Sequence, residues 1–358
     1  MRYLAKIGCV ALVVIATFPG CEKKFDLSTL PQQGAGTLDT AYIQISPSFG
    51  GFTDPQDVII GNDQLIYVAD STRVVMMNLA GAELSSRAML HPISLAQDSR
   101  LDLLVGGEVV ATNGDTAGAI FRIHLVSSSP DSAHRLEVAR MDTVWKELAK
   151  PARRFPGLTV LPDNTWLAAR TGPDNSSFID PDARILLFSA SDVFITPVPA
   201  FATRVGSGIT DINIPTGIAS FPGVRDFVLI QSSVGVSYCA LWMQYQSNSE
   251  FEGWLPRYDP ASAVDRQVDF IRPNRYVQPE GVTIDRARRD VFIADAALDS
   301  VFKFNSRGSF KVESFGFAKS DGLMHRPTGL AFFNKILYVL DGQTGNLLRF
   351  TMTTDVPR

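Results

Sequence analysis

The sequence predicts an all-β fold, a six-bladed β-propeller closed by an N-terminal strand in its last blade. The first observation is a proline that opens a short apolar run six times, at Pro55, Pro92, Pro156, Pro215, Pro279 and Pro327. The second is an apolar segment that follows three of these prolines and ends at Asp70, Asp295 and Asp341. Repetition of one supersecondary unit at this scale is typical of a ring of β-sheet blades.

Each of the six units predicts an inner strand after the proline, a second strand that ends near the aspartate position, and a third strand. The third strands include segments 73–77, 184–188 and 301–304, which are rich in β-branched and aromatic residues. Most units predict a fourth strand, for example over 135–139. Segment 142–150 predicts a short helix, because Trp145 and Leu148 are spaced for one helical face.

The two ends of the domain predict how the ring closes. The last unit has no room for a fourth strand after Met352, and the segment 42–45 precedes the first proline without a unit of its own. Pairing 42–45 onto the last blade would cover two exposed strand edges. An open sandwich of the same strands is the alternative.

The paired pattern resembles the NHL repeat. In the fifth unit it reads Pro279-Glu280-Gly281 followed by a segment that ends at Asp295, and in the sixth Pro327-Thr328-Gly329 followed by one that ends at Asp341. The first unit is also clear, whereas units two, three and four hold Gly106, Arg170 and Gln231 at the aspartate position. The resemblance implies a six-bladed propeller. It implies no particular chemistry, because the family includes enzymes and binding platforms.

The N-terminus predicts a lipoprotein signal peptide over residues 1–20. Two basic residues precede the apolar run 7–18, which is too short for the roughly 20 residues of a membrane-spanning helix. Gly20-Cys21 resembles the lipobox of bacterial lipoproteins, so Cys21 is the expected lipidation site. A plain secretory signal is the alternative.

Residues 21–41 predict a flexible tether, and 42–358 a single propeller domain. The formal net charge of the whole chain is −4 and no cluster of lysine and arginine stands out, which argues against nucleic acid as a partner. We expect a monomer attached to the membrane by lipid alone. Glu22, in place of an inner-membrane retention aspartate, favours the outer membrane of the cell envelope.

Propeller geometry predicts where a ligand would bind. The turn that enters each inner strand and the turn that leaves each second strand lie on the same face, so these residues surround one mouth of the central channel. A concave mouth of mixed polarity is the default binding site. The ligand-binding candidates are Glu280, Arg326, His91, Arg154, Gln56, Thr216, Thr328 and Arg170.

The aspartates that end the second strands are expected to have a structural role rather than a catalytic one. Asp70, Asp295 and Asp341 are expected to accept hydrogen bonds from turn N–H groups. Glu280 is different, because the repeat does not require a carboxylate at its position. No metal ligands are assigned, since the four histidines are not spaced for zinc.

Two function classes stay open. The first is a binding module for an envelope protein or a small or glycan ligand, which needs no cofactor and no catalytic residues. The second is a metal-dependent hydrolase, which resembles gluconolactonase-like six-bladed propellers and would bind a divalent cation through Glu280. The resemblance implies a cation held by Glu, Asn and Asp at the channel, but no asparagine follows the opening proline of these units, where Thr216 and Thr328 stand. We therefore favour the binding module.

Overall fold

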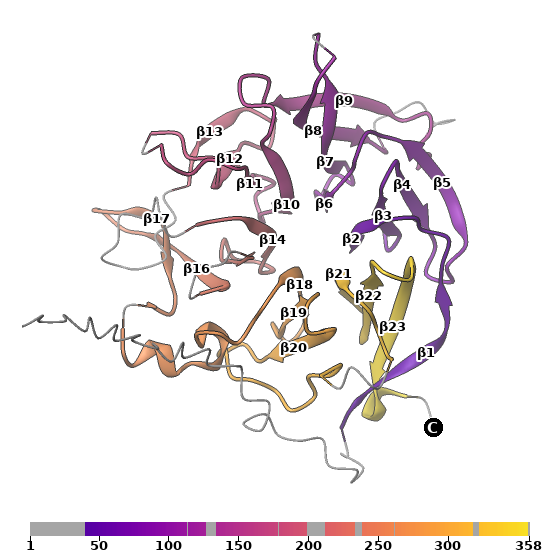
Figure 1. Ribbon diagram of the computed structural model, residues 1–358, viewed down its shortest axis with the longest axis vertical. Helices are drawn as coiled ribbons and strands as arrows, with labels where there is room; N and C mark the ends of the chain where they lie inside the picture. Colours follow the sequence, from indigo (N-terminus) through magenta and orange to yellow (C-terminus); the bar gives the residue numbers. More distant parts are fainter. Residues whose placement is uncertain are drawn as a thin grey trace, which may run out of the picture. The chain divides into compact units, whose positions relative to one another are not determined.

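The computed structural model describes residues 40–112, 114–126, 134–177, 179–198, 212–232, 238–260, 262–317 and 322–356. The predicted signal peptide, Cys21 and almost all of the predicted tether lie outside these residues. The described part forms six antiparallel sheets arranged as the blades of a propeller, which confirms the predicted fold class and excludes an open sandwich. Figure 1 shows the innermost strand of each blade facing the centre of the ring.

The first three blades each contain four strands in sequential order. The strands are β2 (Pro55–Ile60), β3 (Ile66–Asp70), β4 (Arg73–Met77) and β5 (Glu83–Ala88); β6 (Ser94–Gln97), β7 (Leu103–Val110), β8 (Thr116–His124) and β9 (Arg140–Lys146); β10 (Arg154–Val160), β11 (Trp166–Thr171), β12 (Arg184–Phe188) and β13 (Phe194–Pro197).

The fourth blade also has four strands, whereas the fifth has three. The strands are β14 (Pro215–Ser220), β15 (Phe227–Gln231), β16 (Ala240–Ser247) and β17 (Glu252–Pro256), then β18 (Pro279–Ile284), β19 (Val291–Asp295) and β20 (Ser300–Phe304). Two 3₁₀ turns, η3 (Asp265–Gln267) and η4 (Asp269–Ile271), lie between these blades in sequence.

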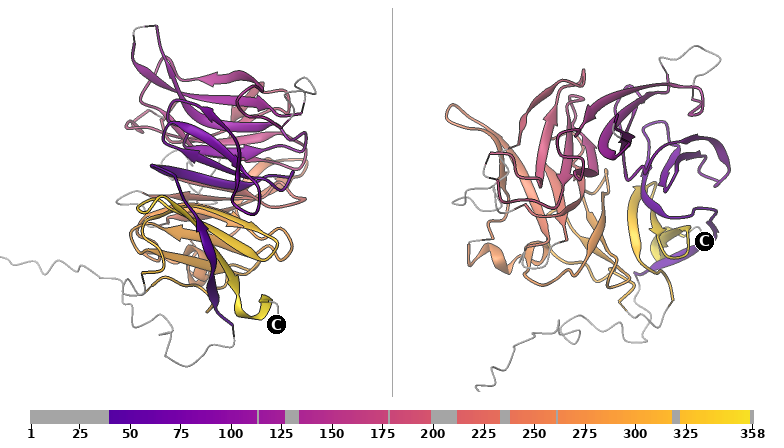
Figure 2. Two further views of the ribbon diagram at one scale, coloured as in Figure 1. Left: turned by 90° about the vertical axis from the view of Figure 1, so that its right-hand side faces the viewer. Right: turned by 45° about the horizontal axis from the view of Figure 1, so that its top comes forward.

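The last blade confirms the predicted closure. It consists of β21 (Pro327–Phe333), β22 (Ile336–Asp341), β23 (Asn346–Met352) and the N-terminal strand β1 (Tyr42–Phe49), followed by η6 (Thr353–Asp355). β1 pairs antiparallel with β23 from Tyr42↔Met352 to Phe49↔Leu347. Figure 2 shows β1 lying along the outer edge of the yellow blade.

Two secondary-structure predictions were wrong. The segment 142–150 is no helix, because most of it belongs to β9, and 135–139 forms turns rather than the fourth strand. Trp145 packs its ring against Phe188 and Phe194 of the third blade, at centroid distances of 5.5 and 5.3 Å. Packing between neighbouring blades thus overrides the helix that the local spacing suggested for this segment.

The core lies between neighbouring blades rather than inside any one of them. One cluster combines the second and third blades through residues such as Leu104, Phe155 and Trp166, all fully buried. The Trp166 and Phe188 rings stack at a centroid distance of 4.0 Å. This arrangement fixes the six inner strands around the axis, so the channel they enclose has a defined shape.

Candidate functional site

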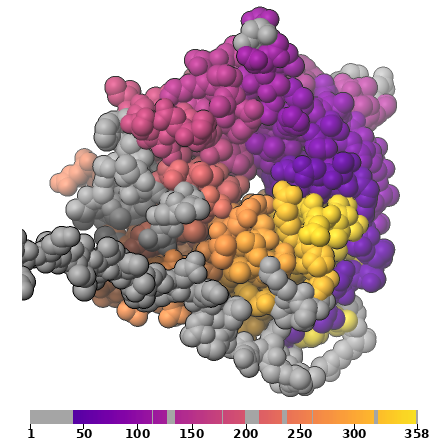
Figure 3. All heavy atoms as spheres, viewed as in Figure 1, coloured from indigo at the N-terminus to yellow at the C-terminus, as the bar shows by residue number. Residues whose placement is uncertain are grey.

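The central channel contains a cavity of about 610 Å³. All six inner strands contribute residues to its wall, and the space-filling view shows the surface hollowed at the centre of the ring (Figure 3). A volume of this size suits a small organic ligand, because binding pockets typically measure 300–1,000 Å³. Six of the eight predicted binding residues line it, namely Gln56, Arg154, Thr216, Glu280, Arg326 and Thr328.

A β-bulge at the start of the inner strands directs several of these side chains. The pairing register shifts between Pro55 and Asp57, and at the matching points of the third to sixth blades. A bulge leaves one residue unpaired and re-aims its side chain. The unpaired residue is Gln56, Thr216, Glu280 or Thr328 in four of these blades. The bulge therefore explains why residues at this position gather at the mouth.

The two threonines connect blades. The Thr216 hydroxyl donates to the carbonyl oxygen of Pro279 at 2.6 Å, and the Thr328 hydroxyl donates to that of Pro55 at 3.0 Å. Each bond links one inner strand to the next one around the ring. Their hydroxyl protons are thus already used, and the threonines serve the channel mainly as wall.

Glu280 stays available at the mouth. Its carboxylate accepts a hydrogen bond from the side-chain amide of Gln278. Burial raises the pKa of Glu280 above its ordinary value, while the Gln278 hydrogen bond and the nearby Arg326 charge act in the opposite direction. The charge at this mouth is therefore mixed rather than uniformly acidic or basic.

The two arginines at the mouth pair with acidic residues other than Glu280. Arg154 donates from Nε to Glu108 Oε1 at 2.7 Å, and Arg326 Nη1 lies 3.9 Å from Asp54 Oδ1. Arg326 is about half exposed, so its guanidinium can still meet a ligand at the rim.

The remaining two predicted residues do not line the cavity. His91 is exposed, and its Nδ1 lies 3.3 Å from Glu108 Oε2. Arg170 is only 4% exposed and donates to Glu147 Oε1 at 2.9 Å and to Asp180 Oδ1 at 2.7 Å. Arg170 therefore belongs to a buried ion network that holds a loop of the third blade.

The three aspartates at the strand ends have the structural role expected of them. Asp70 accepts hydrogen bonds from the backbone N–H groups of Thr53, Asp54 and Ser71. Asp295 and Asp341 make equivalent bonds to the turns of the fifth and sixth blades. These carboxylates fix the loops that carry the mouth residues.

Sequence reasoning missed Asp57, which lies inside the channel. The pairing register aligns Asp57 with Gly157, Gly217, Gly281 and Gly329. Ser94 takes this place in the second blade, and its pairing with Gly106 moves the aspartate position of that blade to Gly107. The same register shows that Gly157 matches Gly217 and not Thr216, so the third unit is offset by one residue from its proline. A comparison of the residue two places after each proline could have found Asp57.

The glycines at this position reflect close contact between inner strands. A Cβ on Gly329 would lie 3.0 Å from the backbone nitrogen of Val58, and one on Gly281 would lie 3.1 Å from the Gly329 Cα. Asp57 instead places a carboxylate between β2 and β6. Its Oδ2 accepts from the Leu95 N–H and its Oδ1 from its own neighbour Val58, both at 2.8 Å.

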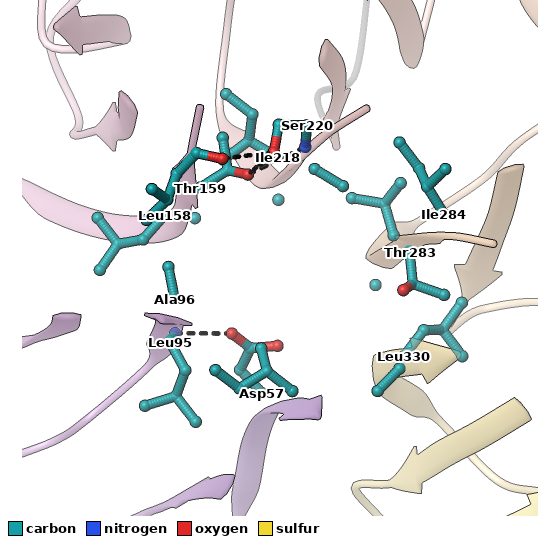
Figure 4. Close-up of a pocket in the computed structure, with 18 of the residues that line it drawn as sticks. Asp57, Leu95, Ala96, Leu158, Thr159, Ile218, Ser220, Thr283, Ile284 and Leu330 are labelled. Carbon is teal, nitrogen blue, oxygen red and sulfur yellow. Dashed lines mark hydrogen bonds between the residues drawn. The ribbon is translucent and has the colours of Figure 1, made fainter. Parts of the chain in front are cut away.

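Burial raises the pKa of Asp57 to about 7, although the backbone N–H groups of Leu95 and Val58 favour the charged form. The carboxylate lies against apolar wall, as Figure 4 shows, and hydrocarbon disfavours charge. Asp57 is thus a group in the channel whose charge changes near neutral pH.

This raised pKa predicts a pH-dependent stability. Between the unfolded value of 3.8 and about 7, the folded state holds a proton that the unfolded state has released, so the free energy of unfolding falls as pH rises. The free energy of unfolding falls by at most about 4 kcal/mol over this range. We expect the free energy of unfolding, measured in urea between pH 5 and 8, to depend less on pH in Asp57→Asn than in wild type. An unchanged slope would contradict the assignment.

The wall around Asp57 is largely apolar. Figure 4 shows Leu95, Leu158, Ile218, Ile284 and Leu330 around the same cavity. Two hydroxyls bond to each other across neighbouring blades, because Thr159 Oγ1 donates to Ser220 Oγ at 2.9 Å. We call this inner part of the channel, between Asp57 and these apolar residues, the waist.

Two further findings concern the described residues only. They contain no group of three or more histidine, cysteine, aspartate or glutamate side chains placed to hold a metal ion. No helix among them has the length and hydrophobicity needed to cross a bilayer.

No protein-family model and no curated protein matches the sequence. Solved structures match the fold. The PQQ-bound aldose sugar dehydrogenase from Streptomyces coelicolor has a TM-score of 0.58 and 13% identity, covering 87% of this chain and 98% of that one. A gluconolactonase from Xanthomonas campestris has a TM-score of 0.56 and 13% identity, with coverages of 86% and 91%.

A third similar structure is an auxiliary nutrient binding protein from Bacteroides thetaiotaomicron. Its TM-score is 0.56 at 9% identity, with 84% of this chain and 70% of that chain covered. At such low identities the likeness establishes the shared six-bladed propeller and nothing about the ligand. The fold thus occurs in enzymes and in a binding protein alike.

Proposed function

We propose that this protein is a lipid-anchored, extracytoplasmic β-propeller that binds a small polar ligand through its central channel. The observation that carries the proposal is the cavity of about 610 Å³, which has a mixed-charge mouth above an apolar waist. Ligand sites combine an apolar wall with a few polar groups that fix orientation. Glu280, Gln56 and Arg326 are the polar groups at the mouth.

A sugar or short glycan is the ligand class that this surface favours. Hydroxyl groups can donate to the Glu280 carboxylate and accept from the Gln56 amide or the Arg326 guanidinium. The proteins that share this fold include an aldose sugar dehydrogenase and a gluconolactonase, so sugars are the first ligands to test. An envelope protein that docks on the rim is the other partner we consider.

The lipid anchor is part of the same proposal. It rests on the apolar run 7–18 and on Gly20-Cys21, with the NHL-like repeat as the platform that the tether carries. We propose attachment to the outer membrane as a monomer. Metabolic labelling with an alkyne fatty acid tests the anchor, because Cys21→Ala should abolish the label.

A hydrolase is the second candidate, and the observation that favours it is the presence of two carboxylates, Glu280 and Asp57, on one cavity wall. A divalent cation fits poorly, since calcium takes six to eight oxygen ligands and the described residues gather no three acidic or histidine side chains for one. Titration with Ca²⁺ and Zn²⁺, together with a lactone hydrolysis assay, tests this candidate. Metal-dependent turnover that Glu280→Gln abolishes would favour it over the binding module.

The binding proposal is tested with the full chain in detergent against a panel of monosaccharides, sugar acids and short glycans. We expect at least one to raise the melting temperature and to bind by calorimetry, and we expect Gln56→Ala and Glu280→Gln to weaken it. Glu250→Gln is the control, because Glu250 is exposed and does not line the cavity. If no sugar binds and the wild-type protein instead captures an envelope protein through its rim, the proposed small ligand is wrong and the partner is a protein.

A further inference from the structure

Asp57 is a carboxylate without a cationic partner in the described structure. The acceptor bonds that we find for it are those from two backbone N–H groups, of Leu95 and Val58. No described lysine, arginine or histidine lies within ion-pair distance of it. Carboxylates surrounded by protein are normally paired with a positive charge, because desolvation strongly disfavours an isolated ion.

The other charged side chains on the cavity wall each have a side-chain partner, whereas those found for Asp57 are backbone groups. Arg154 pairs with Glu108, and Arg286 Nη1 donates to Asn62 Oδ1 at 2.9 Å. Arg326 faces Asp54, and Glu280 accepts from Gln278. These four are the charged residues that line the cavity besides Asp57, and they come from the third, fifth and sixth blades.

The position of Asp57 makes a purely structural explanation insufficient. Four blades place glycine at the aligned position and the second blade places Ser94, whose hydroxyl bonds the carbonyl oxygen of Phe155 at 2.6 Å. A neutral hydroxyl therefore suffices to bridge neighbouring inner strands. A carboxylate adds a charge that the bridge does not require.

We propose that the waist of the channel binds the protonated amine of a small ligand, and that Asp57 supplies the carboxylate that pairs with it. This inference rests on the proposed function and specifies its ligand as an amine-bearing sugar or a similarly sized polar amine. The apolar residues around the waist make the surroundings of Asp57 less polar than bulk water, which strengthens the ion pair, while the mouth residues bind the hydroxyl groups.

The pairing has a consequence for pH. Because Asp57 changes charge at a pKa of about 7, its carboxylate is almost fully formed at pH 8.5 and largely protonated at pH 5.5. Affinity for a permanently charged amine should therefore fall about 30-fold over this range. Glu280 is the other acid on the wall, and an Asp57 variant separates its contribution.

The experiment compares two matched probes on the full chain by calorimetry. 6-Amino-6-deoxy-D-glucose carries a primary amine that is mostly protonated over this range, and D-glucose has a hydroxyl in its place. We expect the amino sugar to bind about tenfold or more tightly than glucose at pH 8.5. We also expect Asp57→Asn to remove this preference and the pH dependence, with Glu250→Gln as the control of equal charge change.

The outcomes separate this inference from the proposed function. Equal affinity for both probes, or an amino-sugar preference that survives in Asp57→Asn, would overturn the inference and leave a neutral sugar as ligand. Binding of neither probe would overturn the inference and also remove these sugars from the proposed function. The comparison of probes on wild type needs no variant, and melting curves establish that Asp57→Asn is folded.

Discussion

A chain that begins at Gly50 is expected to lose at least about 5 kcal/mol of unfolding free energy relative to a chain that begins at Thr40. The deletion removes β1 and leaves β23 with an unpaired edge. It also removes Tyr42 and Phe49, which are 8% and 7% exposed, and loss of one buried aromatic side chain typically costs about 3–5 kcal/mol.

The contacts of Tyr42 explain why one strand matters so much. Its ring stacks on Phe315 at 5.3 Å and meets Phe292 edge-on at 6.1 Å, so it ties the last blade to the fifth. Lys303 places its ammonium 5.4 Å from the same ring. Urea unfolding measures the difference, and Tyr42→Ala gives a milder version of it. Equal stability of the two chains would contradict ring closure by β1.

Arg170→Met is expected to destabilise the protein by about 3–5 kcal/mol and to leave channel binding unchanged. Arg170 contacts Glu147, which is 6% exposed, and Asp180, while Arg153 contacts Glu147 and Asp182 in the same network. Removing one partner of a buried ion network leaves an uncompensated charge.

The matched control for this prediction is Arg307→Met, because Arg307 is exposed. It should change the unfolding free energy by less than about 0.5 kcal/mol. Affinity for the channel probe, measured well below the melting temperature, distinguishes the structural role of Arg170 from the binding role that the sequence suggested. A stable Arg170→Met protein with weakened binding would restore that binding role.

Much of the fold was predictable because its signals are local and repeated. Pro55 and Pro279 open inner strands, and Asp295 and Asp341 cap turns through bonds to nearby residues. The pairing of β1 with β23 followed from counting strands, since the last unit lacked one. The spacing of Trp145 and Leu148 imitates a helix, whereas the ring of Trp145 packs against Phe188 of the next blade.

The candidate site was predictable only at its mouth. Gln56 and Glu280 stand directly after recognisable prolines, whereas Asp57 stands one residue further on, at a place that the pairing register shows to face the next inner strand. The environment of Arg170 depends on loop residues that no repeat aligns with it. Raised or lowered pKa values depend on burial by several blades at once, which no single segment encodes.

The most direct test of the account is methyl NMR of the full chain in detergent, with isoleucine and leucine methyl groups labelled and 6-amino-6-deoxy-D-glucose added. The account predicts saturable shifts at Leu95, Ile218 and Leu330, which line the cavity, and their loss in Asp57→Asn. Shifts confined to residues on the outer strands would contradict a ligand site in the channel. Equal channel shifts in wild type and variant would contradict the role of Asp57.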